Sequence, residues 1–393
     1  MAATSYSPLF PTRHLQYDRP HRQLETESNR TAEVRERARD LGVRIGQLGT
    51  GPGNAITDVR GVRVGHRTIV RGDDGDPHAA RTGVTAIFPH EGTPWEERVY
   101  AGTHILNGYG ELIGINQINE WGMLMSPIVL TSSMQIGKAY DATVRWMANV
   151  SSRAAEQVMP VVSECDDSFL NDVLSFPLLD EDVAAALDGA QGGPVQEGAV
   201  GAGTGMQCFD FKGGIGTASR VVEPFVVGVL VLTNHGDRPG LLIDGVRVGE
   251  AIPDHTPVEH SDGSCVVVVA TDAPLLPHQL RRLAERAGLG LARGGSYAAD
   301  GSGEQMLAFS TANRLPGNSR DGLWELRVAA DGVSGPPWLM SSLFEATVEA
   351  TEEAVTDALF AAETVVGRDG NTLFGMPVER ALEALDRAGR LAR

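Results

Sequence analysis

Two short apolar runs constrain the fold of this chain more than any other feature. They are VVEPFVVGVLVLTN (residues 221–234) and SCVVVVAT (264–271). Neither alternates apolar with polar residues, so each predicts a strand that is covered on both faces. Apolar residues at helical spacing follow in LPHQLRRLAERAGL (276–289) and in the long segment 343–366. Buried strands with amphipathic helices predict a mixed α/β protein.

The remaining segments give weaker patterns. Residues 31–41 and 142–159 are expected to form helices, and the glycine-punctuated stretch 42–72 is expected to form strands joined by tight turns. Residues 181–199 predict a helical turn followed by a surface loop, and residues 1–22 a loose arm. No internal repeat or linker is visible, so the whole chain, 1–393, is expected to form a single domain.

Composition excludes several classes of function. The formal charge is −18 and no basic stripe is present, so no nucleic-acid partner is expected. The N-terminus lacks the apolar run of a signal peptide, and no stretch approaches about 20 apolar residues, so we expect a cytoplasmic protein with no membrane partner. Cys165, Cys208 and Cys265 lie far apart without a CxxC pattern, and we expect no disulfide, metal or cofactor.

Common catalytic motifs are absent from the sequence. There is no GxSxG elbow, no HExxH and no P-loop. Gly201, Gly203 and Gly205 suggest a nucleotide-binding loop, but Met206 stands where GxGxxG needs its third glycine. A glycine-rich turn that brings backbones close together is the interpretation we adopt.

The Gly263–Ser264 step joins a polar, turn-rich segment to an apolar strand. A serine hydroxyl can attack the carbonyl of the preceding residue where the backbone is bent, and glycine tolerates such bends. Cleavage would leave Ser264 as an N-terminal nucleophile with a free amine beside it. The alternative is a turn that simply ends before a strand. The dipeptide alone does not decide, because it recurs at Gly295–Ser296 and Gly301–Ser302.

The sequence around this junction, residues 263–313, resembles the L-aminopeptidase/D-esterase (DmpA) family, the self-processing serine peptidases of S58 type that include β-peptidyl aminopeptidases. In that family the precursor splits at a Gly–Ser-type junction before VVVATDAPL. Further similar stretches occur in family order: GPGNAITDVRGVRVGHRTI (51–69), NGYGELIG (107–114), SPIVLTSSMQIG (126–137), VGAGTGMQCFDFKGGIGTASR (200–220), VGVLVLTNHGDR (227–238) and EATEEAVTDAL (349–359).

The resemblance implies a fold and an activity. The fold is a four-layer αββα sandwich similar to N-terminal-nucleophile hydrolases. The chain is expected to cut itself into an α-chain, 1–263, and a β-chain, 264–393, and to assemble as a homo-oligomer, a tetramer of such pairs. The expected substrates are short peptides, aminoacyl amides or esters, from which an N-terminal α- or β-amino acid is released without a cofactor.

The resemblance also implies roles for particular residues. Ser264 matches the nucleophile, and Ser302 and Glu304 in the pattern SGE match the residues that assist it, since a hydroxyl held by a carboxylate can relay a proton. Asn234 matches the oxyanion-site donor. Each also has a structural interpretation. GSGE is a polar turn before a strand, and an asparagine after a buried strand commonly caps a turn.

An acidic residue before the pattern G-x-L-x-x-P binds the substrate amine in relatives. The corresponding segment reads Asn119-Glu120-Trp121-Gly122, so Glu120 is the expected amine-binding residue and Trp121 a wall of the pocket. Asn119 departs from the pair of acids that relatives often carry. The alternative is that Glu120 lies on a solvated turn.

Two other classes of function remain open. An acyl transferase similar to ornithine acetyltransferase has a related sandwich, but it uses threonine where this chain has Ser264. An inactive binding relative is the second alternative. The joint presence of Ser264, Ser302, Glu304 and Asn234 argues against it.

Overall fold

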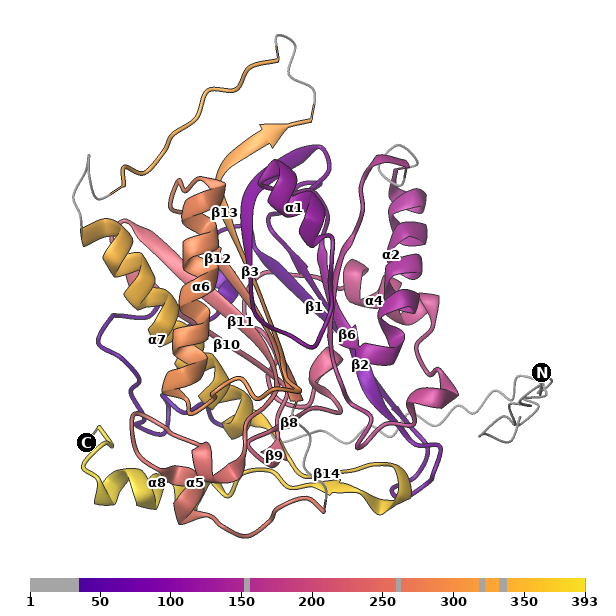
Figure 1. The fold of residues 1–393 in the computed structure, drawn as a ribbon, viewed down its shortest axis with the longest axis vertical. Helices are drawn as coiled ribbons and strands as arrows, with labels where there is room; N and C mark the ends of the chain where they lie inside the picture. The colour runs from indigo at the N-terminus through magenta and orange to yellow at the C-terminus, as the bar shows by residue number, and fades with distance from the viewer. Residues whose placement is uncertain (1–34, 152–155, 259–262, 318–321, 332–337, 393) are drawn as a thin grey trace, which may run out of the picture. The chain divides into compact units, whose positions relative to one another are not determined.

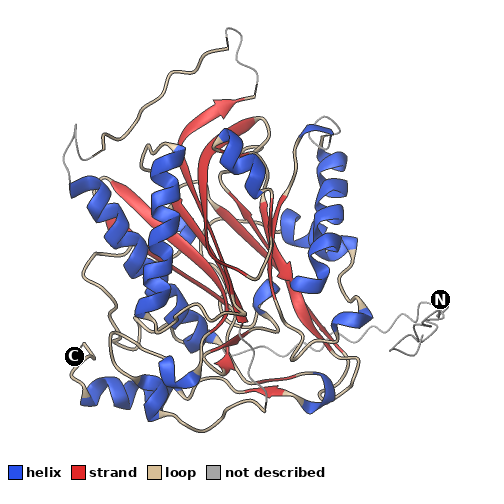
Figure 2. Cartoon of the chain, in the orientation of Figure 1, coloured by secondary structure: helices blue, strands red, loops and turns tan. Residues whose placement is uncertain are grey.

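The computed structural model describes residues 35–151, 156–258, 263–317, 322–331 and 338–392. Within the compact unit Arg35–Arg393, two β-sheets face each other and helices cover the outer face of each (Figures 1 and 2). The predicted αββα arrangement is therefore confirmed. In the described parts of the chain, no helix combines the length and the apolar character needed to cross a bilayer.

The larger sheet carries the junction. Its strand order is β10 (Ile215–Val222), β11 (Phe225–His235), β12 (Gly263–Thr271), β13 (Gly303–Pro316), β3 (Glu97–Gly108) and β5 (Met123–Leu124). All neighbouring strands are antiparallel except β12 and β13, which are parallel. Helix α6 (Pro277–Arg293) makes the crossover between these two strands and packs on the sheet beside α7 (Trp338–Ala361).

The smaller sheet faces the larger one. Its strands are, in order, β1 (Arg63–Arg71), β2 (Ala80–Phe88), β6 (Ile128–Ser132), β7 (Val161–Cys165) and β4 (Leu112–Ile113). Its outer face is covered by α2 (Ile136–Val150) and α4 (Asp180–Asp188). The remaining elements are α1 (Ile115–Trp121), α5 (Val248–Ala251), α8 (Val378–Arg387), the hairpin of β8 (Gln207–Cys208) with β9 (Phe211–Lys212), and the hairpin of β14 (Val365–Val366) with β15 (Thr372–Leu373).

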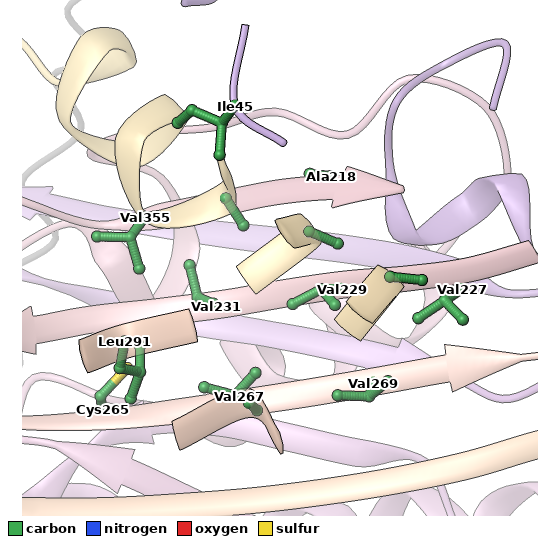
Figure 3. Close-up of a cluster of buried hydrophobic side chains, with 14 of the residues drawn as sticks. Ile45, Ala218, Val227, Val229, Val231, Cys265, Val267, Val269, Leu291 and Val355 are labelled. Atoms are coloured by element: carbon green, nitrogen blue, oxygen red, sulfur yellow. The ribbon is translucent and has the colours of Figure 1, made fainter. Parts of the chain in front are cut away.

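Three apolar layers explain why the central strands are apolar throughout. One cluster lies between the larger sheet and α6 and α7, a second between the two sheets, and a third between the smaller sheet and α2 and α4. On β12, Val267 contributes to the first layer while Val266 and Val268 contribute to the second. Figure 3 labels the side chains of the first layer that alternate along the two central strands: Val227, Val229 and Val231 of β11, and Cys265, Val267 and Val269 of β12.

Most predicted elements form, with shifted ends. The run 264–271 is strand β12, and 276–289 lies inside α6. The run 221–234 is divided, because a turn at Glu223–Pro224 separates the end of β10 from β11. The helix predicted over 343–366 starts earlier and ends at Ala361, before β14.

Other predictions needed larger corrections. The helix expected over 142–159 is α2, which ends at Val150, and 181–199 is α4 followed by an irregular segment. Within the stretch 42–72, β1 forms but residues 56–58 are a 3₁₀ turn. The helix expected over 31–41 is wrong where the structure describes it, because residues 35–41 form only irregular backbone and turns. Residues 1–34 lie outside the described chain.

A buried ionic cluster explains this last difference. Arg37 and Arg39 pair with acids of α7, Asp357 at 2.7 Å and Glu353 at 2.6 Å, so their side chains are directed by tertiary contacts and not by helical spacing. Arg220 of β10 is fully buried and donates from Nε to Glu349 at 3.0 Å. Glu349 also accepts from the backbone N–H of Gln47 and Leu48.

The cluster predicts a large cost for neutralising Glu349. Replacing one partner of a buried ion pair leaves the other charge uncompensated, which costs about 3–5 kcal/mol. We therefore expect Glu349→Gln to lower the free energy of unfolding by about that amount in urea titrations. Glu345→Gln, on an exposed position of the same helix, should change it by less than about 0.5 kcal/mol. Equal effects would contradict a stabilising cluster.

Candidate active site

Gly263 begins β12 in a conformation that favours glycine. Its φ is +79°, and a Cβ atom built there would lie 1.9 Å from the backbone oxygen of Asn234. A side chain at this position would therefore overlap the neighbouring strand. The positive φ agrees with the expectation that glycine tolerates a bent backbone at this junction.

Ser264 and Asn234 lie directly opposite each other on β12 and β11. Direct cross-strand partners present their side chains on the same face, here the face toward the second sheet. Both residues are buried, with exposed fractions of 4% and 2%. Asn234 Oδ1 accepts a hydrogen bond from the backbone N–H of Gln207 at 2.8 Å.

Two of their polar atoms have no hydrogen-bond partner among the described residues. These are Ser264 Oγ and Asn234 Nδ2. Buried polar groups in folded proteins normally have hydrogen-bond partners, so these two atoms without partners call for an explanation. A substrate carbonyl placed between a hydroxyl nucleophile and an amide donor would supply it.

Ser302 and Glu304 flank the residue that pairs with Ser264. The parallel ladder sets Gly303 opposite Ser264 and Glu304 opposite Cys265. The Ser302 hydroxyl donates to Glu304 Oε1, while Glu304 Oε2 has no hydrogen-bond partner in the described chain. Burial raises the pKa of Glu304. A carboxylate with a raised pKa accepts a proton more readily near neutral pH.

The structure thus brings four predicted residues to one end of three adjacent strands. Ser264 and Asn234 face the space between the sheets. Glu304 shares the face of Cys265, which packs toward the helical layer. Ser302 precedes β13 and lines a small pocket together with Gly236, Asp237, Ser296, Tyr297, Ala298 and Ala299.

Glu164 is a buried acid at this site that the sequence analysis missed. It lies on β7, accepts from the backbone N–H of Glu111 at 2.8 Å and from the Ser133 hydroxyl, and is only 6% exposed. A Cβ atom at Gly110 would lie 3.3 Å from Glu164 Oε1 and 3.4 Å from Gly303 Cα, so the carboxylate is close to the strand beside Ser264. Burial raises its pKa. The available signal was an acid inside the apolar run VVSEC.

Glu120 and Trp121 are not brought to Ser264 within this chain. The carbonyl of Gly122, the residue after α1, accepts a hydrogen bond from the backbone N–H of Ala101 on β3. Across the sheet, Ser264 is aligned with a different residue of β3, Gly108. At about 3.3 Å per residue, this stretch of strand spans roughly 20 Å. Glu120 is exposed, and Trp121 is 52% exposed. Glu120 therefore occupies a solvated position, as in the alternative interpretation, but in the last turn of α1 and not in a loop.

Other polar groups near the junction are held neutral by burial. His235 lies opposite Gly263, and burial lowers its pKa to about 4. Cys165 approaches the Ser264 hydroxyl, and burial raises the pKa of its thiol. Among the described residues, no group of three or more His, Cys, Asp or Glu side chains could hold a metal ion.

The glycine-rich segment forms a close-packed turn. Gly201–Gly203 is a 3₁₀ turn, and a Cβ atom at Gly203 would lie 2.6 Å from the backbone nitrogen of Ile215. Close approach of two backbones is therefore what these glycines permit, as the sequence analysis preferred.

Comparison with known proteins gives consistent matches. The family described as Peptidase family S58 matches residues 54–373. The β-peptidyl aminopeptidase BapA of Sphingosinicella xenopeptidilytica is 43% identical over 367 residues, 87% of this chain and 89% of the relative. The BapA of Sphingosinicella microcystinivorans is 41% identical over 91% of this chain and 93% of its own.

Solved structures match the fold at similar identity. A β-aminopeptidase from a Burkholderia species has a TM-score of 0.82 at 43% identity, covering 90% of this chain and 99% of that one. The L-aminopeptidase D-Ala-esterase/amidase of Ochrobactrum anthropi has a TM-score of 0.84 at 43% identity, covering 91% and 99%. The latter is described as a prototype of the serine aminopeptidases and a variant of the N-terminal-nucleophile hydrolase fold.

The geometry of Gly263 leads to a stability prediction. Gly263→Ala and Gly245→Ala both place alanine at a positive φ, which costs about 1–2 kcal/mol, but Gly245 has open space around it. Gly263→Ala should cost about 1–3 kcal/mol more, because its Cβ overlaps Asn234. Both are compared by urea unfolding with Ser264 replaced by alanine, so that the junction stays intact. Equal losses would show that the strand ends are not packed as described.

Proposed function

This chain belongs to peptidase family S58, and we propose that it cuts its own Gly263–Ser264 bond and then acts as a serine aminopeptidase on short peptides, amides or esters. One observation carries the proposal. Ser264 is the second residue of the buried strand β12, directly after a glycine at positive φ, and lies opposite Asn234, whose Nδ2 has no partner among the described residues.

The self-cleavage step follows from this placement. Ser264 Oγ attacks the Gly263 carbonyl carbon and displaces the Ser264 nitrogen, which leaves an ester between the two residues and a free amine. Water then hydrolyses the ester, which releases the Gly263 carboxylate and restores the hydroxyl. A glycine at positive φ supplies the bent backbone that this attack requires.

The same hydroxyl performs substrate hydrolysis in this proposal. Ser264 attacks the substrate carbonyl, and its proton passes to a neighbouring base, either the new α-amine or the Ser302–Glu304 pair. The Asn234 amide donates to the developing oxyanion. The leaving amine or alcohol takes up a proton, and water releases the aminoacyl group from Ser264.

Glu164 is the group we assign to the substrate's free amine. It is a buried carboxylate near Gly303, and two hydrogen bonds fix its orientation. An ammonium ion would compensate its charge, whereas an acetylated amine would not. This explains how one site would select N-terminal residues and reject internal peptide bonds.

The other classes of function make different predictions. An acyl transferase similar to ornithine acetyltransferase would exchange acetyl groups with ornithine, and an inactive binder would hydrolyse nothing. Hydrolysis of aminoacyl p-nitroanilides by the wild-type chain indicates the peptidase, and acetyl exchange with ornithine indicates the transferase. The absence of both activities indicates the inactive binder. The number of chains in the native assembly is also open; we propose a tetramer of cleaved pairs, and a sedimentation mass equal to one chain would contradict it.

Self-cleavage is tested on denaturing gels. We expect fragments of about two-thirds and one-third of the 41.8 kDa mass that elute together from a native column, since β12 is a central strand of its sheet. Ser264→Ala should stay whole and inactive. Cleavage of that variant at the same bond would contradict the intramolecular mechanism.

Amine recognition is tested with alanine p-nitroanilide and its N-acetyl form. The wild type should cleave only the free amine. Glu164→Gln should lower kcat/KM for it by a factor of hundreds, since an uncompensated charge costs about 3–5 kcal/mol. Glu120→Gln serves as the control and should behave like the wild type. The reverse ranking of the two variants, with melting temperatures unchanged, would return the amine site to Glu120.

A further inference from the structure

Lys212 is a fully buried lysine behind the candidate oxyanion donor. It ends the β8–β9 hairpin, and its side chain has an exposed fraction of 0%. Nζ donates to three backbone carbonyl oxygens, those of Gly203 at 2.9 Å, Met206 at 2.8 Å and Gly213 at 2.7 Å. An ammonium has three donors, so these bonds use all of them.

The bond to Met206 connects Lys212 to Asn234 through a single peptide unit. The Met206 carbonyl and the Gln207 N–H belong to the same planar amide. Lys212 Nζ donates to the oxygen of that amide, and the N–H of the same amide, which belongs to Gln207, donates to Asn234 Oδ1 at 2.8 Å. In a trans peptide the carbonyl and the N–H point in opposite directions. The Met206–Gln207 amide is therefore hydrogen-bonded on one side to the Lys212 ammonium and on the other side to the Asn234 side chain.

The orientation of the Asn234 amide depends on that N–H. Oδ1 accepts from Gln207, which leaves Nδ2 on the side where it has no partner among the described residues. The flipped amide would set one N–H donor against another. A cation on the carbonyl also polarises the amide and strengthens its N–H as a donor.

We infer that Lys212 is a positioning residue for catalysis: through the Met206–Gln207 peptide it fixes the Asn234 side chain with Nδ2 toward the substrate carbonyl. This rests on the oxyanion role proposed for Asn234. Burial lowers the pKa of Lys212 to about 7, and the nearby Cys208 and Asp167 act in the opposite direction.

Lys212 also holds the Gly203–Met206 turn against β9, so a structural role must be separated from positioning. A double-mutant cycle does this, because a residue that acts only through Asn234 has nothing left to lose once Asn234 is removed. The variants are Lys212→Met, Asn234→Ala and the pair. Lys138→Met is the control, at the only other lysine of the sequence, which is partly exposed on α2.

Turnover of alanine p-nitroanilide is counted per cleaved chain, with the cleaved fraction read by mass spectrometry. Where a variant stays uncut, the rate of self-cleavage of the purified full chain replaces kcat in the cycle. We expect Lys212→Met to lower kcat about 10–100-fold with little change in KM, since misplacing an oxyanion donor costs less than removing it. In the Asn234→Ala background the further loss should be below about threefold.

An equal loss in both backgrounds, or a rise in KM at unchanged kcat, would overturn the inference. If Lys212→Met does not fold, Lys212→Gln, which retains two N–H donors, replaces it in the same cycle under the same criteria. A wild type that hydrolyses no aminoacyl substrate would contradict the proposed function instead. An Asn234→Ala variant with wild-type kcat would remove the role of Asn234, and with it the inference.

Discussion

The hydrogen-bonded ladder of β11, β12 and β13 is the constraint on which the rest of the site depends. Its register sets Ser264 opposite Asn234 on one side and Gly303 on the other. A one-residue slip would turn Ser264 toward the helical layer and expose the wrong face of every valine on β12. The two apolar layers on either side of the strand prevent that slip, so the core itself fixes the position of the nucleophile.

Buried polar groups in this structure are of two kinds: ion-paired groups that stabilise the fold, and groups without partners at the candidate active site. The acids of α7 are paired with Arg37, Arg39 and Arg220, which joins the N-terminal segment to the larger sheet. At the strand ends, by contrast, Ser264 Oγ, Asn234 Nδ2 and Glu304 Oε2 have no partner among the described residues. Unsatisfied groups of this kind are costly to keep, and a fold retains them where they serve a ligand.

The apolar patterns predicted a mixed α/β fold with buried strands, whereas the four layers and the candidate site residues were expected from the family resemblance. Uninterrupted apolar strands such as 264–271 report burial on both faces, and residues close to the junction are placed by that strand and its neighbours. The position of Glu164 could not be found this way, because Glu164 lies on the opposite sheet and comes close to Gly303, the neighbour of Ser264, only beside Gly110. Glu120 was expected near Ser264 from a local sequence pattern. Such a pattern carries no information about which end of β3 the residue lies against. The turn at Glu223–Pro224 and the ion-paired segment around Arg37 likewise depend on tertiary contacts.

The central claim is that Ser264 becomes the nucleophile after the chain is cut. Rapid acid quenching during turnover of an alanine p-nitrophenyl ester, followed by mass spectrometry of the digested 264–393 fragment, tests it most directly. The account predicts an alanyl adduct on the peptide that begins with Ser264, absent from uncut chains and from acetylalanine ester reactions. An adduct on another residue, or steady hydrolysis by chains that remain whole, would contradict it.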